Sequence, residues 1–304
     1  MLTPDYLFII LIMNANTLVL TVLSLPKYRR RLPKIYWIAR SWWWMLALLF
    51  GCYLVSSLQN KAGHYPYWWA LDGLFVLIGL RGLYEISRLG RLAGKTKLLH
   101  KLATQVSALE RLSEKKATEP ALTNITPKAE DSAIPLVIHS RLDALMVVSL
   151  FTLIISLIFL HHLTWAREAS GILLFVLFAS QFNDIAQYLC GRAFGGRFFQ
   201  RKLAPKISPN KTIEGALFGT LLSAILATIL GLWLTTFGAL VCFGCAYLLA
   251  VSGVMGDLFE SAFKRRHGVK DTGTLLAGHG GVLDRIDSLL IGIPLFTLLY
   301  WLLL

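Results

Sequence analysis

The uncharged run from Gly215 to Gly256, "GALFGTLLSAILATILGLWLTTFGALVCFGCAYLLAVSGVMG", decides the fold class. A helix that crosses a bilayer needs roughly 20 residues, so this run is too long for one crossing and suits two. The expected turn lies near Phe237-Gly238, because glycine commonly interrupts a helix. The run therefore predicts two neighbouring membrane-spanning helices, at 213–235 and 237–256.

The rest of the chain has the same apolar character. It is 56% hydrophobic and only 15% charged, whereas soluble domains carry about 25% charged residues. Further candidate spans lie at 6–25, 41–58, 67–87, 142–160, 169–190 and 287–304. The first lacks a preceding basic stretch and a cleavage site, so we interpret it as a retained span. We predict an all-α, polytopic transmembrane bundle of about eight spans.

The distribution of positive charge predicts how the bundle is oriented. With eight spans, 28 of the 30 Lys and Arg residues fall on one face, in the segments 27–40, 81–141, 192–211 and 264–285. By the positive-inside rule this face is cytoplasmic, and both termini lie on the non-cytoplasmic side. The net charge of +13 therefore indicates how the chain is oriented in the membrane, and we expect no nucleic-acid partner.

Composition divides the chain into three regions. Residues 1–89 form an N-terminal region of three spans, and residues 141–304 form a core of five. Between them, residues 90–140 are rich in Lys, Glu, Thr, Ser and Pro, which predicts a polar cytoplasmic linker. Its first part has helix-like spacing of apolar residues and is a candidate surface helix.

Ionisable residues at membrane depth are costly, so each is a functional candidate. One cluster ends the span at 169–190. Asp184, Gln187, Tyr188 and Gly191 are spaced i, i+3, i+4 and i+7, which places them on one helix face. Such a face on a membrane helix is expected to look into the bundle or into a wet cavity.

A second cluster is "KISPNKTIEG", residues 206–215. Ser208 followed by Pro209 predicts a helix start, with serine as the N-cap and proline at the first helical position. A helix N-terminus with hydroxyls and lysines suits a phosphate. The candidate phosphate-binding residues here are Ser208, Asn210, Lys211 and Thr212.

The third cluster continues the span at 237–256 and ends in "GHGGVLDRIDS", residues 278–288. Acidic residues from two helix ends can share Mg²⁺, which prefers carboxylates, waters and substrate phosphates. The candidate metal ligands are Asp257, Asp284 and Asp287. Lysines and arginines can neutralise polyphosphate, and glycines let backbone N–H groups approach it. These candidates are Lys264, Arg265, Lys270, Arg285, Gly280 and Gly281.

The third cluster also carries a family resemblance. Its residues, in their spacing, are Ser261, Lys264, Arg265, Lys270, Asp271, His279, Gly280, Gly281, Asp284, Arg285 and Asp287. This pattern resembles the signature of the phosphatidate cytidylyltransferases, also called CDP-diacylglycerol synthases. The resemblance covers roughly residue 141 to the C-terminus. It departs from the family at residues 90–140, where about two more spans are expected, and this bears on the lipid-facing wall.

The resemblance implies the reaction of CTP with phosphatidate to give CDP-diacylglycerol and pyrophosphate. It implies Mg²⁺, with a second cation left open, and a homodimer in a bacterial inner membrane with its active site facing the cytoplasm. The implied catalytic residues are Asp257, Lys264, Asp271, His279, Asp284 and Arg285. The implied substrate-binding residues are Ser208, Asn210, Lys211, Thr212, Ser261, Arg265, Lys270, Gly280, Gly281 and Asp184. His279 is expected to orient the glycine loop.

Two alternatives stay open. The lipid could be a polyprenyl or ether-lipid phosphate, or the chain could be a catalytically silent membrane scaffold. A transporter is disfavoured, because the acidic residues gather at one membrane face instead of lining a path through the bilayer.

Overall fold

The structure, a computed structural model, describes residues 3–61, 63–113, 141–273 and 280–303. In chain order the elements are α1 Pro4–Ser24, α2 Pro26–Arg31, α3 Pro33–Ser56, α4 Trp69–Ser113, α5 Arg141–Ala166, α6 Gly171–Phe194, β1 Lys202–Ala204, β2 Ser208–Thr212, α7 Ile213–Leu234, α8 Ala239–Arg266, α9 Leu283–Ile286 and α10 Leu289–Leu303. Every apolar segment predicted from the sequence lies in a helix. In the described residues, six helices are long and apolar enough to cross a membrane, namely α1, α3, α5, α6, α7 and α8. These helices identify an integral membrane protein.

The two helices predicted from the long uncharged run are confirmed. α7 ends at Leu234, and α8 begins at Ala239 with Gly238 as its N-cap residue. The connection falls where the Phe237-Gly238 turn was expected, and α7 and α8 pack against each other. α10, the last apolar segment, is a shorter helix that packs on α5 and α8.

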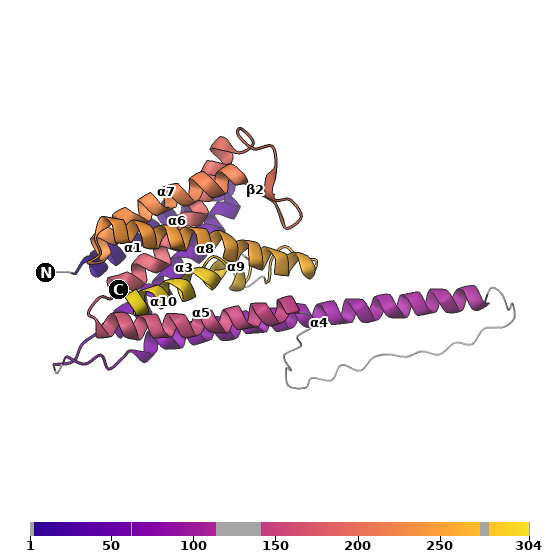
Figure 1. The fold of residues 1–304 in the computed structure, drawn as a ribbon, viewed down its shortest axis with the longest axis horizontal. Helices are drawn as coiled ribbons and strands as arrows, with labels where there is room; N and C mark the ends of the chain where they lie inside the picture. Colours follow the sequence, from indigo (N-terminus) through magenta and orange to yellow (C-terminus); the bar gives the residue numbers. More distant parts are fainter. Residues whose placement is uncertain (1–2, 62, 114–140, 274–279, 304) are drawn as a thin grey trace.

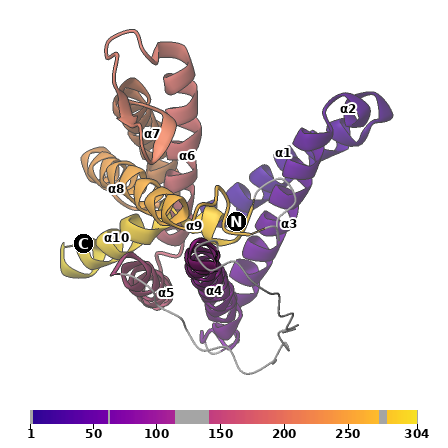
Figure 2. The ribbon, with the colours of Figure 1, turned by 90° about the vertical axis from the view of Figure 1, so that its right-hand side faces the viewer.

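α6 is the most enclosed of the apolar helices. Within its most apolar stretch 61% of the residues are buried, against 11% for α1. α6 packs against α7 and α8 (Figure 1). The N-terminal helices α1 and α3 form a separate arm (Figure 2). Phe8, Phe50 and Phe178 join this arm to α6, with ring centroids 4.8 Å apart for Phe8–Phe178 and 5.8 Å for Phe50–Phe178.

The bundle has two distinct ends (Figure 1). We call one the terminal end, because both chain termini lie there. The other is the hairpin end, where β1, β2 and the last turns of α8 lie. The functional candidates from the sequence gather toward the hairpin end.

The chain is mostly helical, as predicted, and the strands add one short hairpin. β1 and β2 pair antiparallel, with Lys202 opposite Thr212 and Ala204 opposite Ser208. The hairpin corrects one prediction. The helix expected to start at Ser208-Pro209 starts instead at Ile213. The Thr212 hydroxyl accepts a hydrogen bond from the Gly215 N–H at 3.0 Å and so caps α7. Ser208 pairs with Ala204 in the hairpin, so it is not available as the N-cap of the helix.

α4 extends well beyond the rest of the bundle (Figure 1). It runs from Trp69 to Ser113 as one helix, so the helix predicted in the first part of the polar segment continues the third apolar segment without a break. The rest of the predicted linker, residues 114–140, lies outside the described residues.

Candidate active site

A cavity of about 600 Å³ lies between α6, the start of α7, α8 and α9. It is lined by Asp184, Gln187, Tyr188, Gly191, Arg192, Asn210, Lys211, Thr212, Gly215, Ala216, Asp257, Asp284, Arg285 and Asp287. All three sequence clusters therefore contribute to one cavity. The cavity is lined by all four residues of the face predicted on α6, namely Asp184, Gln187, Tyr188 and Gly191.

Asp257 joins α8 to the hairpin. Its carboxylate forms an ion pair with the ammonium group of Lys211, which comes from β2. Its other oxygen accepts a hydrogen bond from the Ser261 hydroxyl, one helical turn later on α8, at 3.2 Å. The Asp257 carboxylate thus already attracts one positive group, and a metal ion bound there would compete with Lys211.

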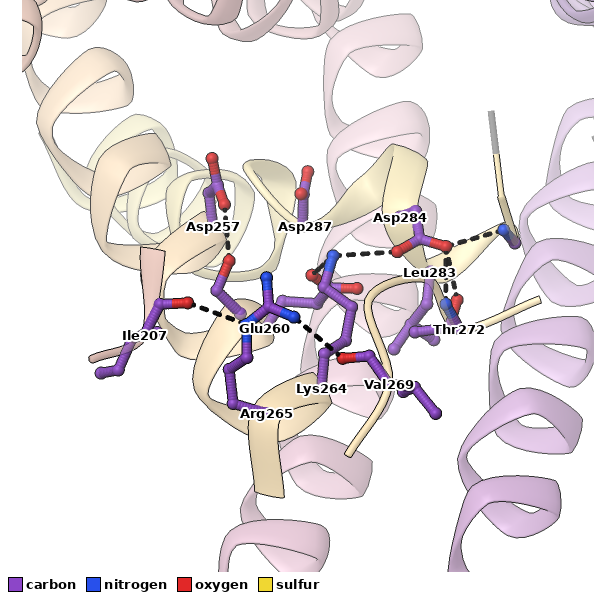
Figure 3. A network of polar contacts seen from close by, with 12 residues as sticks. Ile207, Asp257, Glu260, Lys264, Arg265, Val269, Thr272, Leu283, Asp284 and Asp287 are labelled. Atoms are coloured by element: carbon purple, nitrogen blue, oxygen red, sulfur yellow. Dashed lines mark hydrogen bonds and ion pairs between the residues drawn. The ribbon is translucent and has the colours of Figure 1, made fainter. Parts of the chain in front are cut away.

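Asp284 organises the loop before α9 (Figure 3). Its Oδ2 accepts hydrogen bonds from the Gly281 N–H at 2.7 Å and from both the N–H and the hydroxyl of Thr272 at 2.9 Å. Its Oδ1 pairs with Lys264 at 2.9 Å, and Lys264 also pairs with the buried Glu260. Burial alone would raise the pKa of Asp284, but Lys264 and the donated hydrogen bonds hold that pKa below its ordinary value.

Asp287 lies next to Asp257 because α8 comes very close to the backbone there. A Cβ at Gly256 would overlap the Asp287 carbonyl oxygen, so only glycine permits this approach. The negative charges of Asp184, Asp257 and Asp287 act on one another. A half-enclosed cavity with this charge and oxygen-only ligands fits Mg²⁺, which binds one or two carboxylates together with waters and substrate phosphates.

Other predicted residues take different positions. Arg265 is exposed and donates to the carbonyls of Ile207 at 3.1 Å and Val269 at 3.3 Å. Ser208, Lys270 and Asp271 also do not line the cavity. His279 lies outside the described residues.

The glycine pair has a packing role that the sequence did not indicate. Gly280 has a φ of +85° and a Cβ on it would lie 2.5 Å from Asp284 Oδ2. A Cβ on Gly281 would overlap the Glu85 carboxylate and the Thr272 hydroxyl. Glycine is therefore required here so that the loop can close around two carboxylates.

Glu85 is the main residue that sequence reasoning missed. It is fully buried on α4 and accepts hydrogen bonds from the N–H groups of Val282 and Leu283 and from the Thr272 hydroxyl, each at 3.0 Å. It therefore holds the start of α9, which carries Asp284 and Arg285. The only sequence signal was an ionisable residue within an apolar helix.

Glu214 plays a similar part beside the hairpin. It is buried in the first turn of α7 and accepts hydrogen bonds from the N–H groups of Gly196, Phe198 and Phe199 at 2.8 to 3.0 Å. This carboxylate fixes the turn that leads from α6 to β1. Glu214 was not among the functional candidates predicted from the sequence.

The chain matches one family model over almost its whole length and several curated proteins over shorter stretches. The sequence model of the "Cytidylyltransferase family" matches residues 3–303. The chain is 46% identical over 125 residues to the uncharacterized protein YnbB of Escherichia coli, covering 41% of each chain. It is 46% identical over 113 residues to a phosphatidate cytidylyltransferase of Helicobacter pylori, covering 37% of this chain and 42% of that protein.

A phosphatidate cytidylyltransferase of Pseudomonas aeruginosa is 45% identical over 141 residues, which are 44% of this chain and 48% of that protein. The chain thus spans slightly less than half the length of these curated relatives.

Proposed function

Because the chain belongs to the cytidylyltransferase family, we propose that it transfers the cytidylyl group of CTP to a lipid phosphate. Phosphatidate is the proposed substrate, and the products are CDP-diacylglycerol and pyrophosphate. One observation carries the proposal: a polar cavity and an apolar pocket meet at a single side chain, Arg285.

The apolar pocket has a volume of about 330 Å³. Its wall includes Trp42 and Leu46 from α3, Phe75 from α4 and Phe178 from α6. Such a wall can hold part of an acyl chain. Arg285 lines both spaces, and its guanidinium group can bind two phosphate oxygens at once. A lipid phosphate would then have its chain in the apolar pocket and its headgroup at the edge of the acidic cavity.

In the reaction, an oxygen of the lipid phosphate attacks the α-phosphorus of CTP. The bond between the α-phosphorus and the bridging oxygen to the β-phosphate breaks, and pyrophosphate leaves. The attacking group is already anionic at neutral pH, so positioning and charge neutralisation matter more than a general base. Lys211 and Arg285 supply positive charge on two sides of the cavity. Asn210 and Thr212 are the nearby hydrogen-bonding groups proposed for the nucleotide.

Asp257 and Asp287, with Oδ1 of Asp284, would hold Mg²⁺. When bound, the metal ion offsets negative charge on the leaving pyrophosphate. Asp184 would contact the metal or the nucleotide. Lys264 would keep Asp284 oriented, since Lys264 bridges it to Glu260. Asp271 and His279 stay in the proposed catalytic set, with Lys270 as a phosphate contact, on the family resemblance.

We also propose that the chain crosses a bacterial inner membrane eight times and acts as a homodimer. The first part of α4 and α10 would supply the two crossings beyond the six long apolar helices. The hairpin end would then face the cytoplasm, and both termini would face the other side. The distribution of 28 of the 30 lysines and arginines supports this arrangement.

The test is pyrophosphate release by the purified protein from CTP with phosphatidate, with and without Mg²⁺. Polyprenyl phosphate and an ether-lipid phosphate are run in parallel. Release with phosphatidate that requires CTP and Mg²⁺ supports the proposal. Release only with another lipid phosphate would reassign the substrate, and no release with any lipid would favour a silent scaffold.

A further inference from the structure

A second polar cluster lies at the terminal end, away from the active-site cavity. It consists of Asp72 near the start of α4 and His161 and His162 near the end of α5. His161 Nδ1 lies 2.7 Å from Asp72 Oδ1, and His162 Nε2 lies 2.8 Å from Asp72 Oδ2. We call these residues the His–Asp cluster. Each offers one ligand atom, and these atoms lie within 4.8 Å of one another.

We propose that the His–Asp cluster binds a divalent transition-metal ion of the Zn²⁺ class. Two imidazole nitrogens with one carboxylate oxygen are a donor set that favours Zn²⁺ over Mg²⁺ or Ca²⁺. With zinc–nitrogen bonds of about 2.0 to 2.1 Å, two ligand atoms on one ion lie no more than about 4.2 Å apart. A small rotation of the His162 side chain, which is 48% exposed, would bring the ligand atoms within this distance. Its exposure also leaves a route for the ion to enter.

The His161 ring is almost fully buried, and its Nδ1 faces the Asp72 carboxylate. The nitrogen that would bind the metal ion is therefore already held close to the carboxylate ligand. Aromatic rings flank the cluster, with Trp165 at 4.5 Å from His161 and Trp68 at 5.3 Å from His162, between ring centroids. A metal ion with a remaining position open to water would complete the cluster at its exposed His162 side.

The proposed site is distinct from the carboxylates of the active-site cavity. Asp72 and Glu85 are on the same helix, and at a rise of 1.5 Å per residue they lie about 20 Å apart. In Figure 1 the start of α4 and the end of α5 lie at the terminal end. A metal bound there would tie α4 to α5 at the end opposite the hairpin. In the proposed eight-span arrangement, this end faces away from the cytoplasm.

The experiment measures zinc bound to the full-length protein in detergent. The protein is stripped with EDTA, incubated with Zn²⁺ in excess Mg²⁺ and separated from free metal by gel filtration, and zinc is counted by mass spectrometry. We expect about one zinc ion per chain. His162→Gln and Asp72→Asn should each weaken binding at least about tenfold. His64→Gln, an exposed histidine at the same end, is the matched control and should bind like the wild type.

Two further measurements keep the outcome decisive. Asp257→Asn should retain its zinc, since Asp257 belongs to the other cavity; loss of zinc there would mean that the ion sat among the active-site carboxylates, and would overturn the proposal. Co²⁺ in place of Zn²⁺ should give a visible absorption band that His162→Gln abolishes. Zinc-free wild-type protein, or equal zinc in wild type and His162→Gln, would leave Asp72 as a hydrogen-bond acceptor only and would overturn the proposal.

Discussion

Asp257 and Asp284 both lie beside the cavity, but their contacts differ. Asp284 accepts three hydrogen bonds on one oxygen and pairs with Lys264 through the other. Among the residues that the structure describes, the partners of Asp257 are Lys211 and the Ser261 hydroxyl. Asp257 is therefore the carboxylate more available to a metal ion, whereas Asp284 also maintains the local fold. Replacing each by asparagine separates these roles.

Asp257→Asn keeps the shape of the side chain and removes one negative charge from the cavity. A neutral amide is a poorer Mg²⁺ ligand. We expect turnover to fall by roughly 10²-fold, the scale of losing one strong electrostatic contact, with little change in melting temperature. Glu168→Gln makes the same chemical change at an exposed position at the terminal end and should leave pyrophosphate release unchanged. Wild-type turnover of Asp257→Asn at low Mg²⁺ would refute the metal assignment.

Asp284→Asn should reduce both turnover and stability. The substitution removes the negative charge of the carboxylate that accepts hydrogen bonds from Gly281 and Thr272 and pairs with Lys264. Hydrogen bonds to charged groups contribute about 1.5 to 3 kcal/mol each to stability. The folded-state pKa of Asp284 is lowered, so its contribution is complete above the unfolded value of about 3.9 and is lost as the pH falls through the folded value.

Melting temperatures in detergent measure this effect. The gap between wild type and Asp284→Asn should be wide at pH 7 and should narrow below about pH 4. A gap that is independent of pH would show that the ionised form of Asp284 does not contribute to stability.

At the same scale, local sequence patterns predicted side chains that share a helix face. The spacing of Asp184, Gln187, Tyr188 and Gly191 was sufficient to place them on one face, because a helix fixes the relative directions of its side chains. The role of Glu85 could not be found in this way. Its partners Thr272 and Leu283 are 187 and 198 positions away, and no local pattern encodes such a contact.

Between elements, the approach of α8 to the start of α10 depends on one glycine. Gly256→Ala would place a Cβ against the Asp287 backbone carbonyl, whereas the space beside Gly244 on the same helix is open. Overpacking costs about 1 to 3 kcal/mol. We expect Gly256→Ala to lower the melting temperature and the turnover, because Asp257 and Asp287 move apart. Gly244→Ala should be neutral or slightly stabilising in both assays, and equal behaviour of the two variants would contradict this packing role.

The link between α4 and α9 gives a second test at this scale. Glu85→Gln leaves one acceptor oxygen for three donors, so the loop that carries Asp284 and Arg285 should shift. A small misplacement of reacting groups can cost up to about 10²-fold, so we expect kcat to fall tenfold or more. Because Glu85 does not line the cavity, the KM for CTP should change little.

Thr272→Val removes one hydroxyl, which contacts both Glu85 and Asp284, but it leaves the two backbone hydrogen bonds to Glu85 and the charge of both carboxylates in place; it should have a smaller effect on kcat. A large rise in the KM for CTP with unchanged kcat in Glu85→Gln would assign Glu85 to substrate binding instead of loop positioning.

The hairpin shows why one element was predicted wrongly. Ser208-Pro209 has the local signature of a helix start, and this signature is sound for an isolated segment. The preceding segment, 202–204, pairs with it and makes a strand more favourable. The helix then begins where the next capping residue, Thr212, is available. Pairing between segments overrides a local preference here.

For the whole molecule, the apolar segments predicted the helices, whereas the orientation that the charge distribution predicts stays a prediction. Each predicted segment became a helix, because a long apolar run favours a membrane helix. The bounds were less accurate, since α3 begins at Pro33, α4 ends at Ser113 and α8 ends at Arg266, in each case outside the apolar run itself. The His–Asp cluster was not foreseen, since Asp72 and His161 are 89 positions apart. The number of crossings depends on α4 and α10, so it needs a direct test.

The topology test uses two exposed lysines from opposite ends of the bundle. In the eight-span arrangement Lys61 faces outward and Lys202, in the hairpin, faces the cytoplasm. A membrane-impermeant maleimide added to intact cells should label Lys61→Cys and should label Lys202→Cys only after the cells are opened. Of the native cysteines, Cys190, Cys242 and Cys245 are buried, and Cys52 is replaced by alanine in both variants.

If α4 did not cross the membrane, every later segment would change sides, and the hairpin would lie on the same side as Lys61. Equal labelling of both variants in intact cells would therefore reject the eight-span arrangement. It would also place the acidic cavity on the side of the membrane that lacks CTP, and so would count against the proposed reaction as well.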